Sequence, residues 1–197
     1  MPIGNCNIFI SVVIILLHMW KNYNKYKVME VFFDNPLPEG LGFQLREISR
    51  KVNIAPKSVS IYLNELVDDG LIVKKPHRVH GYPLYHANAD SDAFRLYKKL
   101  DMIRSISDCG LLDYLSSDFM PDCIVLFGSA SRGEDTDKSD IDIFMKCSKR
   151  KADLRKYEKE LNRKISLFFS ASFKELSSEL KNNIINGVLL KGYLKVF

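Results

Sequence analysis

Apolar positions in the first half of the chain recur at the three- and four-residue spacing of amphipathic helices. Residues 26–33 have helical character and stop at an Asp-Asn-Pro sequence, which breaks helices. Leu45, Ile48 and Val52 fall on one face of the next predicted helix. A short turn at residues 53–56 follows, and the helical pattern then resumes. The pattern predicts three helices, the last two joined by a tight turn.

Two strands are predicted after these helices. The third helix begins at Pro56, where a missing N–H costs nothing, and it ends before Gly70, a residue that favours helix termination. Residues 71–75 and 82–87 read as strands that pair across a loop. A helix, a short turn and a second helix form the supersecondary unit that reads DNA.

A charged amphipathic segment, residues 92–106, links the two halves. Leu96, Leu100 and Ile103 lie along one stripe of this predicted helix. The stripe fits a connecting helix packed on one domain. A helix that joins two copies of the chain is the alternative, because two-fold proteins suit palindromic DNA sites.

The second half opens with an apolar run at 123–127, which predicts a buried strand. Gly128 and Ser129 end this run, and a polar stretch then leads into an apolar segment that carries Asp140 and Asp142. Side chains alternate between the faces of a strand, so the two carboxylates are predicted to project to the same side. A helix at 151–161, a strand at 165–169 and a helix, glycine and strand within 183–190 are predicted to follow.

Composition adds little to this picture, and charge adds one expectation. The 197 residues are 46% hydrophobic and 27% charged, as in ordinary soluble globular proteins. A net charge of +5 is compatible with a polyanionic partner. The four cysteines are scattered without a Cys-x-x-Cys pair, which argues against a disulfide framework and a structural zinc site. A reducing cytoplasm is the expected location.

The apolar segment Ile8–Leu17 needs a separate explanation. It is shorter than the roughly twenty residues that span a bilayer as a helix. No Lys or Arg precedes it and no small-residue cleavage site follows, so a secretory signal is not expected. Residues 1–18 are interpreted as an extension outside the globular unit, and a membrane anchor is the alternative.

The Gly-Ser turn and the two carboxylates together fit a metal-bound triphosphate. Magnesium takes oxygen ligands from one or two carboxylates and from the phosphates. Glycine lets the backbone approach a phosphate, and amides and a serine hydroxyl can donate to it. We therefore expect Asp140 and Asp142 to hold Mg²⁺ or Mn²⁺, and Gly128 and Ser129 to bind a nucleoside triphosphate. Arg132 is expected to contact a phosphate, with capping of the loop as the alternative.

These residues resemble the nucleotidyltransferase superfamily that includes DNA polymerase β and the minimal nucleotidyltransferases. The pattern of that family is a strand, Gly-Ser, about ten residues with an internal glycine, and Asp-x-Asp or Asp-x-Glu on the next strand. Here ten residues separate Ser129 from Asp140, Gly133 lies between them, and Asp142 completes the acidic motif. The resemblance implies Mg-dependent transfer of a nucleoside monophosphate from a nucleoside triphosphate to a hydroxyl.

The resemblance also implies a third carboxylate on the strand at 165–169. That segment contains no Asp or Glu, and Ser166 occupies the position. Glu160 belongs to the preceding helix and would be a poor substitute. The predicted site therefore lacks the ligand that active polymerase-type members use to complete the metal site and activate the attacking hydroxyl.

Residues 46–72 resemble the winged helix-turn-helix transcription regulators. The resemblance implies that the second helix of the motif enters a major groove and that the wing meets phosphates of double-stranded DNA. The residues that would contact DNA are Lys57, Ser58, Ser60, Ile61 and Asn64 on the helix and Lys74, Lys75 and Arg78 on the wing. Contacts to other proteins are the alternative. His77, His80 and His86 are expected at the wing surface rather than at a metal, since no Cys or carboxylate cluster accompanies them.

The predicted fold class is α+β, with an N-terminal winged helix-turn-helix followed by a small nucleotidyltransferase α/β domain that has a mixed sheet. The expected parts are the extension 1–18, the winged helix 19–90, connecting helices 91–119 and the nucleotidyltransferase domain 120–197. Three functions stay open. They are a nucleotidyltransferase coupled to DNA binding, a DNA-binding transcription regulator whose weak transferase domain senses a nucleotide, and an antitoxin-like module that acts on a partner toxin or another protein.

Overall fold

The structure, a computed structural model, describes residues 23–33, 42–77 and 80–196. These residues divide into an N-terminal unit, which ends at Lys98, and a C-terminal unit, which starts at Lys99. The interpretation of residues 1–18, including Ile8–Leu17, lies outside the described residues. None of the helices in the described ranges has both the length and the apolar character that crossing a bilayer requires.

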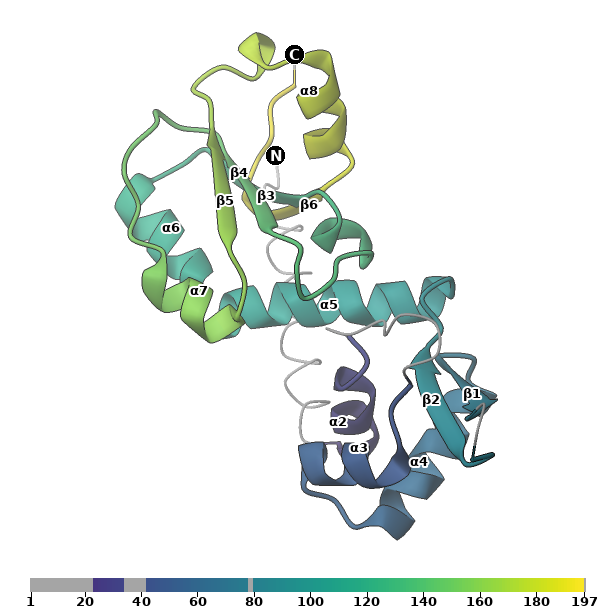
Figure 1. Cartoon of the computed structure of the whole chain (residues 1–197). Coiled ribbons are helices and arrows are strands. Elements are labelled where there is room, and N and C mark those ends of the chain that lie inside the picture. Colours follow the sequence, from purple (N-terminus) through teal and green to yellow (C-terminus); the bar gives the residue numbers. More distant parts are fainter. Residues whose placement is uncertain (1–22, 34–41, 78–79, 197) are drawn as a thin grey trace, which may run out of the picture. The chain divides into compact units, whose positions relative to one another are not determined.

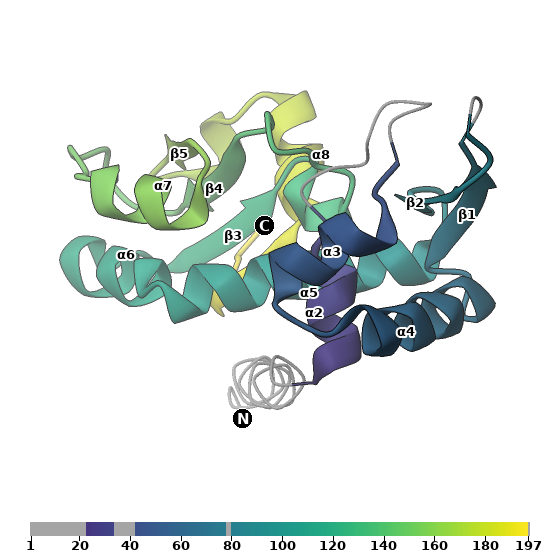
Figure 2. The same cartoon turned by 60° about the horizontal axis from the view of Figure 1, so that its bottom comes forward.

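Three helices and a two-stranded hairpin build the N-terminal unit (Figures 1 and 2). The helices are α2 (Asn24–Glu30), α3 (Leu45–Val52) and α4 (Pro56–Asp68), and the antiparallel strands are β1 (Ile72–Pro76) and β2 (Pro83–Ala87). α3 ends at Asn53, which adopts the left-handed conformation, and Pro56 lies in the first turn of α4. The predicted helix-turn-helix with its hairpin is confirmed. The first helix begins two residues earlier and ends three residues earlier than predicted, and Phe32 and Phe33 lie after its end and enter the core.

One prediction for the wing is wrong. His86 was expected at the surface, yet only 8% of it is exposed. The reason is that β2 has neighbours on both edges: it pairs with β1, and Tyr85 forms a further antiparallel bridge with Phe43. Gly42, next to that bridge, lies so close to the imidazole that a side chain at this position would collide with it. Burial lowers the pKa of His86, and the charge of Lys75 lowers it further.

A four-stranded mixed sheet forms the centre of the C-terminal unit, in the order β5-β4-β3-β6 (Figure 1). The strands are β3 (Cys123–Phe127), β4 (Ile141–Met145), β5 (Ile165–Phe169) and β6 (Val188–Gly192). β3 runs antiparallel to both of its neighbours, β4 and β6, whereas β4 and β5 are parallel. The α+β class and the mixed sheet predicted from the sequence are confirmed.

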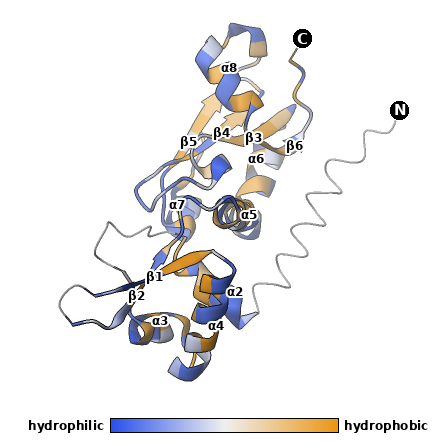
Figure 3. Cartoon of the chain, turned by 90° about the vertical axis from the view of Figure 1, so that its right-hand side faces the viewer, coloured by the Kyte–Doolittle hydropathy of each residue, from blue (hydrophilic) through white to orange (hydrophobic). Residues whose placement is uncertain are grey.

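Both faces of this sheet are covered, so all five residues of β3 are buried and the strands are mainly hydrophobic (Figure 3). One face packs against α5 (Asp92–Asp108), α6 (Leu111–Phe119) and α7 (Arg155–Leu161). The other face packs against η2 (Phe173–Glu175) and α8 (Ser178–Ile185). Because side chains alternate along β4, Asp142 shares the second face with Phe144.

Two helices differ from their predictions. α7 begins at Arg155, four residues later than expected, because Asp153 in the preceding loop accepts hydrogen bonds from Arg155 and fixes the start of the helix. In α5 the predicted apolar stripe is only partly buried, since Leu96 is 54% exposed and Ile103 is 7% exposed. The helix instead places Phe94 in the core of the N-terminal unit and Ile103 in the core of the C-terminal unit.

Candidate nucleotide and DNA-binding sites

The turn after β3 is shaped by Gly128. Its φ of +71° lies in the left-handed region that favours glycine. A Cβ at this position would collide with the carboxylate of Asp142, which lies on the neighbouring strand. No other residue can therefore replace Gly128 without displacing a predicted metal ligand.

The residues that follow Gly128 form a compact loop. Ser129 leads into the short helix η1 (Ala130–Arg132), and its carbonyl accepts hydrogen bonds from the amides of Arg132 and Glu134 at 3.0 and 3.1 Å. The Ser131 hydroxyl donates to the carbonyl of Gly128 at 2.8 Å. These bonds fix the loop so that Ser129 stays beside the end of β3.

Strand pairing brings the two aspartates to this turn. Asp142 pairs with Phe127 of β3, the residue immediately before Gly128, while Asp140 lies just before β4. Asp142 is half-buried and Asp140 is exposed. Burial raises the pKa of Asp142, and the charge of Asp140 raises it further. The two carboxylates thus repel each other at the start of β4, and a cation between them would relieve that repulsion.

Ser166 lies where the sequence placed it. It pairs with Asp142 across the parallel strands β4 and β5, and its hydroxyl donates a hydrogen bond to Asp140 Oδ2 at 3.1 Å. A carboxylate here would have faced the two aspartates. Within the described ranges, no three His, Cys, Asp or Glu side chains gather in one group that could hold a metal ion.

Arg132 is held by its own loop. Its Nε donates to Glu134 Oε2 at 2.6 Å, and both side chains remain well exposed to solvent. Exposed ion pairs of this kind are weak, on the order of 0–1 kcal/mol, so this pair leaves Arg132 free to exchange partners.

Sequence reasoning missed the buried ion pair between Arg163 and Asp135. Arg163 Nη1 donates to Asp135 Oδ2 at 2.6 Å, and the two side chains are 3% and 0% exposed. The pair ties the loop after Gly133 to the start of β5, and it thereby fixes the position of Asp140 between them. No local signal could have revealed it, since 28 residues separate the partners.

The candidate DNA surface consists of one face of α4 and the hairpin. Lys57 and Asn64 are exposed, Ser58 and Ser60 are half-buried, and Ile61 is 53% exposed. Positions 57, 60, 61 and 64 share one side of the helix, as the prediction required. Lys74 and Lys75 are exposed on β1, whereas Arg78 lies outside the described residues. Near them, the rings of His77, His80 and Tyr82 stack with centroids 4.5 to 5.8 Å apart.

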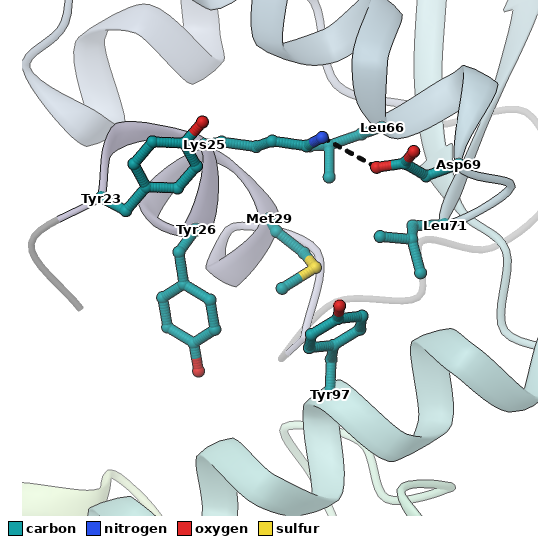
Figure 4. Close-up of a pocket in the computed structure, with 8 residues that line it drawn as sticks. All are labelled: Tyr23, Lys25, Tyr26, Met29, Leu66, Asp69, Leu71 and Tyr97. Carbon is teal, nitrogen blue, oxygen red and sulfur yellow. Dashed lines mark hydrogen bonds and ion pairs between the residues drawn. The ribbon is translucent and has the colours of Figure 1, made fainter. Parts of the chain in front are cut away.

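A cavity of about 490 Å³ lies elsewhere in the N-terminal unit (Figure 4). Lys25 extends across it to Asp69 Oδ2 at 2.7 Å and also pairs with Glu65 at 3.1 Å. Leu66 and Asp69 line the cavity from α4, and Leu66 is about 200° around the helix from Asn64. The cavity is therefore separate from the candidate DNA surface.

Comparison with known families agrees with this division of the chain. Residues 110–194 match the family model "Polymerase beta, Nucleotidyltransferase", and residues 44–73 match the model "Winged helix-turn-helix DNA-binding". No similar curated protein and no similar solved structure was found. The two matches confirm the fused arrangement predicted from the sequence. The chain thus joins a winged helix-turn-helix DNA-binding domain to a domain of the polymerase β nucleotidyltransferase family.

Proposed function

We propose that the protein transfers a nucleoside monophosphate from a nucleoside triphosphate to an acceptor hydroxyl in a magnesium-dependent reaction, and that its winged helix binds double-stranded DNA. The observation that carries this proposal is the placement of half-buried Asp142 and exposed Asp140 beside the left-handed Gly128. That arrangement offers two oxygen ligands for an ion and a backbone that a phosphate can approach.

The carboxylates fit Mg²⁺ or Mn²⁺. Burial and the charge of Asp140 raise the pKa of Asp142, which means that the ionised pair of carboxylates is poorly compensated. A hard cation would supply the positive charge that compensates it. When bound, the ion would neutralise the triphosphate and polarise the α-phosphate. Gly128 and Ser129 would contact the phosphates, and Arg132 would exchange Glu134 for a phosphate oxygen.

In the proposed reaction, the acceptor oxygen forms a bond to the α-phosphorus. The bond from this phosphorus to the oxygen that bridges it to the β-phosphate breaks, pyrophosphate leaves, and the hydroxyl proton passes to water. The side chain at position 166 is a hydroxyl, which donates a hydrogen bond to Asp140. A carboxylate at the same position could have served a second ion or the acceptor. We therefore expect slow transfer.

The same hydrogen bond favours a second candidate, a DNA-binding regulator that senses a nucleotide without transferring it. The Ser166 hydroxyl lies 3.1 Å from Asp140 Oδ2 and carries no charge, so the ion that would serve the acceptor has fewer anionic ligands. The ion that accompanies the triphosphate would still have Asp140 and Asp142.

The test is incubation with each α-³²P-labelled nucleoside triphosphate, with and without Mg²⁺. Proposed transfer predicts slow, Mg-dependent attachment of label to an acceptor together with release of unlabelled pyrophosphate. Mg-dependent nucleotide binding without any transfer would favour the sensor. If nucleotide neither binds nor reacts, both candidates are wrong for the C-terminal unit.

For the N-terminal unit, we expect Lys74→Ala, Lys75→Ala and Arg78→Ala together to weaken binding to all DNA duplexes. Each Lys or Arg that binds a phosphate releases counterions, so losing three should lower the slope of log affinity against log salt by about 2 to 3. Asn64→Ala is the contrast, since loss of a base contact should cost about 1–3 kcal/mol at preferred sequences only. Fluorescence anisotropy over a salt series measures both. If the slope of log affinity against log salt were unchanged in the triple variant, the wing residues would not contact the phosphates of DNA.

A further inference from the structure

The cavity of the N-terminal unit is a second candidate ligand site (Figure 4). Its volume of about 490 Å³ lies within the range of roughly 300–1,000 Å³ that is usual for small-molecule sites. Met29, Leu66 and Leu71 line it, and all three side chains are buried. A small molecule in the cavity would therefore bury its own apolar surface against these side chains.

Three tyrosines complete the wall of the cavity. Tyr23 immediately precedes α2, Tyr26 belongs to α2, and Tyr97 belongs to α5. Figure 4 shows Tyr97 on the opposite side of the cavity from Lys25, with Met29 between them. The face of a tyrosine ring is negative and attracts an organic cation that lies within about 6 Å of the ring centre. The rings thus suit a ligand that carries a positive charge on an apolar body.

The charged groups beside the cavity have an excess of negative charge. Lys25 Nζ lies 2.7 Å from Asp69 Oδ2 and 3.1 Å from Glu65 Oε2, so one ammonium group serves two carboxylates. Burial lowers the pKa of Lys25, but the hydrogen bonds and charges of Asp69 and Glu65 outweigh burial, and the pKa is raised. The three groups therefore carry one positive and two negative charges. They attract a second cation, whereas an anion would have to replace the carboxylates at Lys25.

The two carboxylates are accessible to a further partner. The side chains of Asp69 and Glu65 are 51% and 43% exposed, compared with 21% for Lys25. Among the residues that the structure describes, no second Lys or Arg forms an ion pair with either carboxylate. Each carboxylate binds Lys25 through one oxygen, and its other oxygen can accept a hydrogen bond from a ligand.

We propose that this cavity binds a small organic cation, an amine attached to an apolar or aromatic body. The body packs between the aliphatic side chains and the tyrosine rings, and the ammonium group donates to Asp69. The ligand would contact α4 through Leu66, on the side of the helix that faces away from the candidate DNA surface. The inference is independent of the proposed transfer, because the cavity and the paired aspartates belong to different units.

The first test uses three probes that share a two-ring body and differ in charge: the para-substituted biphenylmethylamine, biphenylmethanol and biphenylcarboxylate. Isothermal titration with the full chain measures their affinities at low and high salt. We expect the amine to bind about 10-fold or more tightly than the alcohol, because hydrogen bonds to charged groups are the stronger ones. High salt should weaken binding of the amine but not of the alcohol. Equal binding of the three probes, tightest binding of the carboxylate, or no binding of the amine would each overturn the proposal.

A pair of charge-matched variants locates the amine. Asp69→Asn removes a charge at nearly constant size and should weaken amine binding about 5-fold or more, while alcohol binding changes less than about 2-fold. Asp68→Asn is the control, because Asp68 is the exposed neighbour of Asp69 and does not line the cavity. It should change amine binding less than about 2-fold. Equal losses in the two variants would indicate general attraction to the surface and would contradict the proposal.

Lys25→Met tests the sign of the charge that the cavity prefers. Removing the ammonium group leaves Asp69 and Glu65 without their cation, so the amine should bind about 3-fold or more tightly. If Lys25 instead served to bind an acid, this variant would lose the carboxylate probe and leave the amine unaffected, and the proposal would be wrong.

The paired aspartates of the C-terminal unit are the other place where an amine could bind. Asp142→Asn should therefore be titrated with the same amine, and its affinity should match that of the native protein within about 2-fold. If Asp142→Asn lost the amine while Asp69→Asn kept it, the amine would lie at the candidate metal site and not in the cavity.

Discussion

Asp142→Asn should reduce Mg-dependent binding of a nucleoside triphosphate by about 10- to 100-fold, because an interaction with a charged partner contributes about 1.5–3 kcal/mol. The substitution keeps the shape of a side chain that fits against Gly128 while it removes the negative charge that would hold the ion. Isothermal titration with a non-hydrolysable nucleotide, in Mg²⁺ and in EDTA, measures the effect. If the native protein and the variant bound the nucleotide equally well in Mg²⁺ and in EDTA, Asp142 would not belong to the nucleotide site.

The same variant should be slightly more stable than the native protein in EDTA at neutral pH. Burial and Asp140 raise the pKa of Asp142 in the folded state, so its ionised form destabilises the fold at neutral pH. This penalty should fade as the pH falls through the raised pKa and be absent below the usual value of 3.8. Because solvent screens the pair, the gain should stay below about 1 kcal/mol, or about 4 °C in melting temperature. A less stable variant would indicate that Asp142 serves the fold instead.

Local patterns were sufficient to predict much of this site. The apolar run that forms β3, the Gly-Ser turn after it and the alternation that places Asp140 and Asp142 together all depend on residues close in sequence. The same holds for the helix-turn-helix, where Asn53 and Pro56 mark the boundary between α3 and α4. Each of these elements follows from backbone or side-chain geometry that depends only on residues close in sequence.

Contacts between distant residues were not predictable in the same way. Arg163 and Asp135 form a buried pair that positions the loop before β4, yet neither residue differs in sequence context from an ordinary surface charge. His86 is buried because Phe43 bridges to the adjacent Tyr85, and nothing near His86 in the sequence indicates that bridge. The hollow beside Asp140 likewise forms from two segments, the loop before β4 and the junction of α7 with β5, which meet through the pairing of β4 with β5 and through the ion pair between Arg163 and Asp135.

Ser166 combines the two kinds of information. The sequence indicated that it replaces a carboxylate, but only the strand register shows that its hydroxyl reaches Asp140. An uncharged donor at this position partly stabilises the Asp140 carboxylate when no ion is present. It supplies no negative charge to the ion that an acceptor hydroxyl requires. The identity of this single side chain therefore bears on the choice between transferase and sensor.

Ser166→Asp should raise the rate of nucleotidyl transfer about 10-fold or more, since groups that assist proton transfer or ion binding at a reacting centre typically contribute about 10²–10⁴-fold. Ser166→Asn is the matched control, because it has a similar size and no charge. A third carboxylate beside Asp140 and Asp142 should also lower the melting temperature in EDTA, and Mg²⁺ should stabilise this variant more than the native protein. Single-turnover release of pyrophosphate from a γ-³²P-labelled nucleoside triphosphate measures the rate, and thermal melts measure the stability.

The outcomes of this experiment distinguish three situations. A faster reaction with larger stabilisation by Mg²⁺ in Ser166→Asp, but not in Ser166→Asn, would identify position 166 as the missing ligand and the native protein as a slow transferase. Stabilisation by Mg²⁺ without transfer in either variant would favour the sensor, because a complete ion site would then be insufficient for chemistry. Rapid turnover by the native protein would contradict the role given to Ser166. A carboxylate from outside β5, such as that of Glu160 on α7 or one from a partner chain, would then have to complete the site.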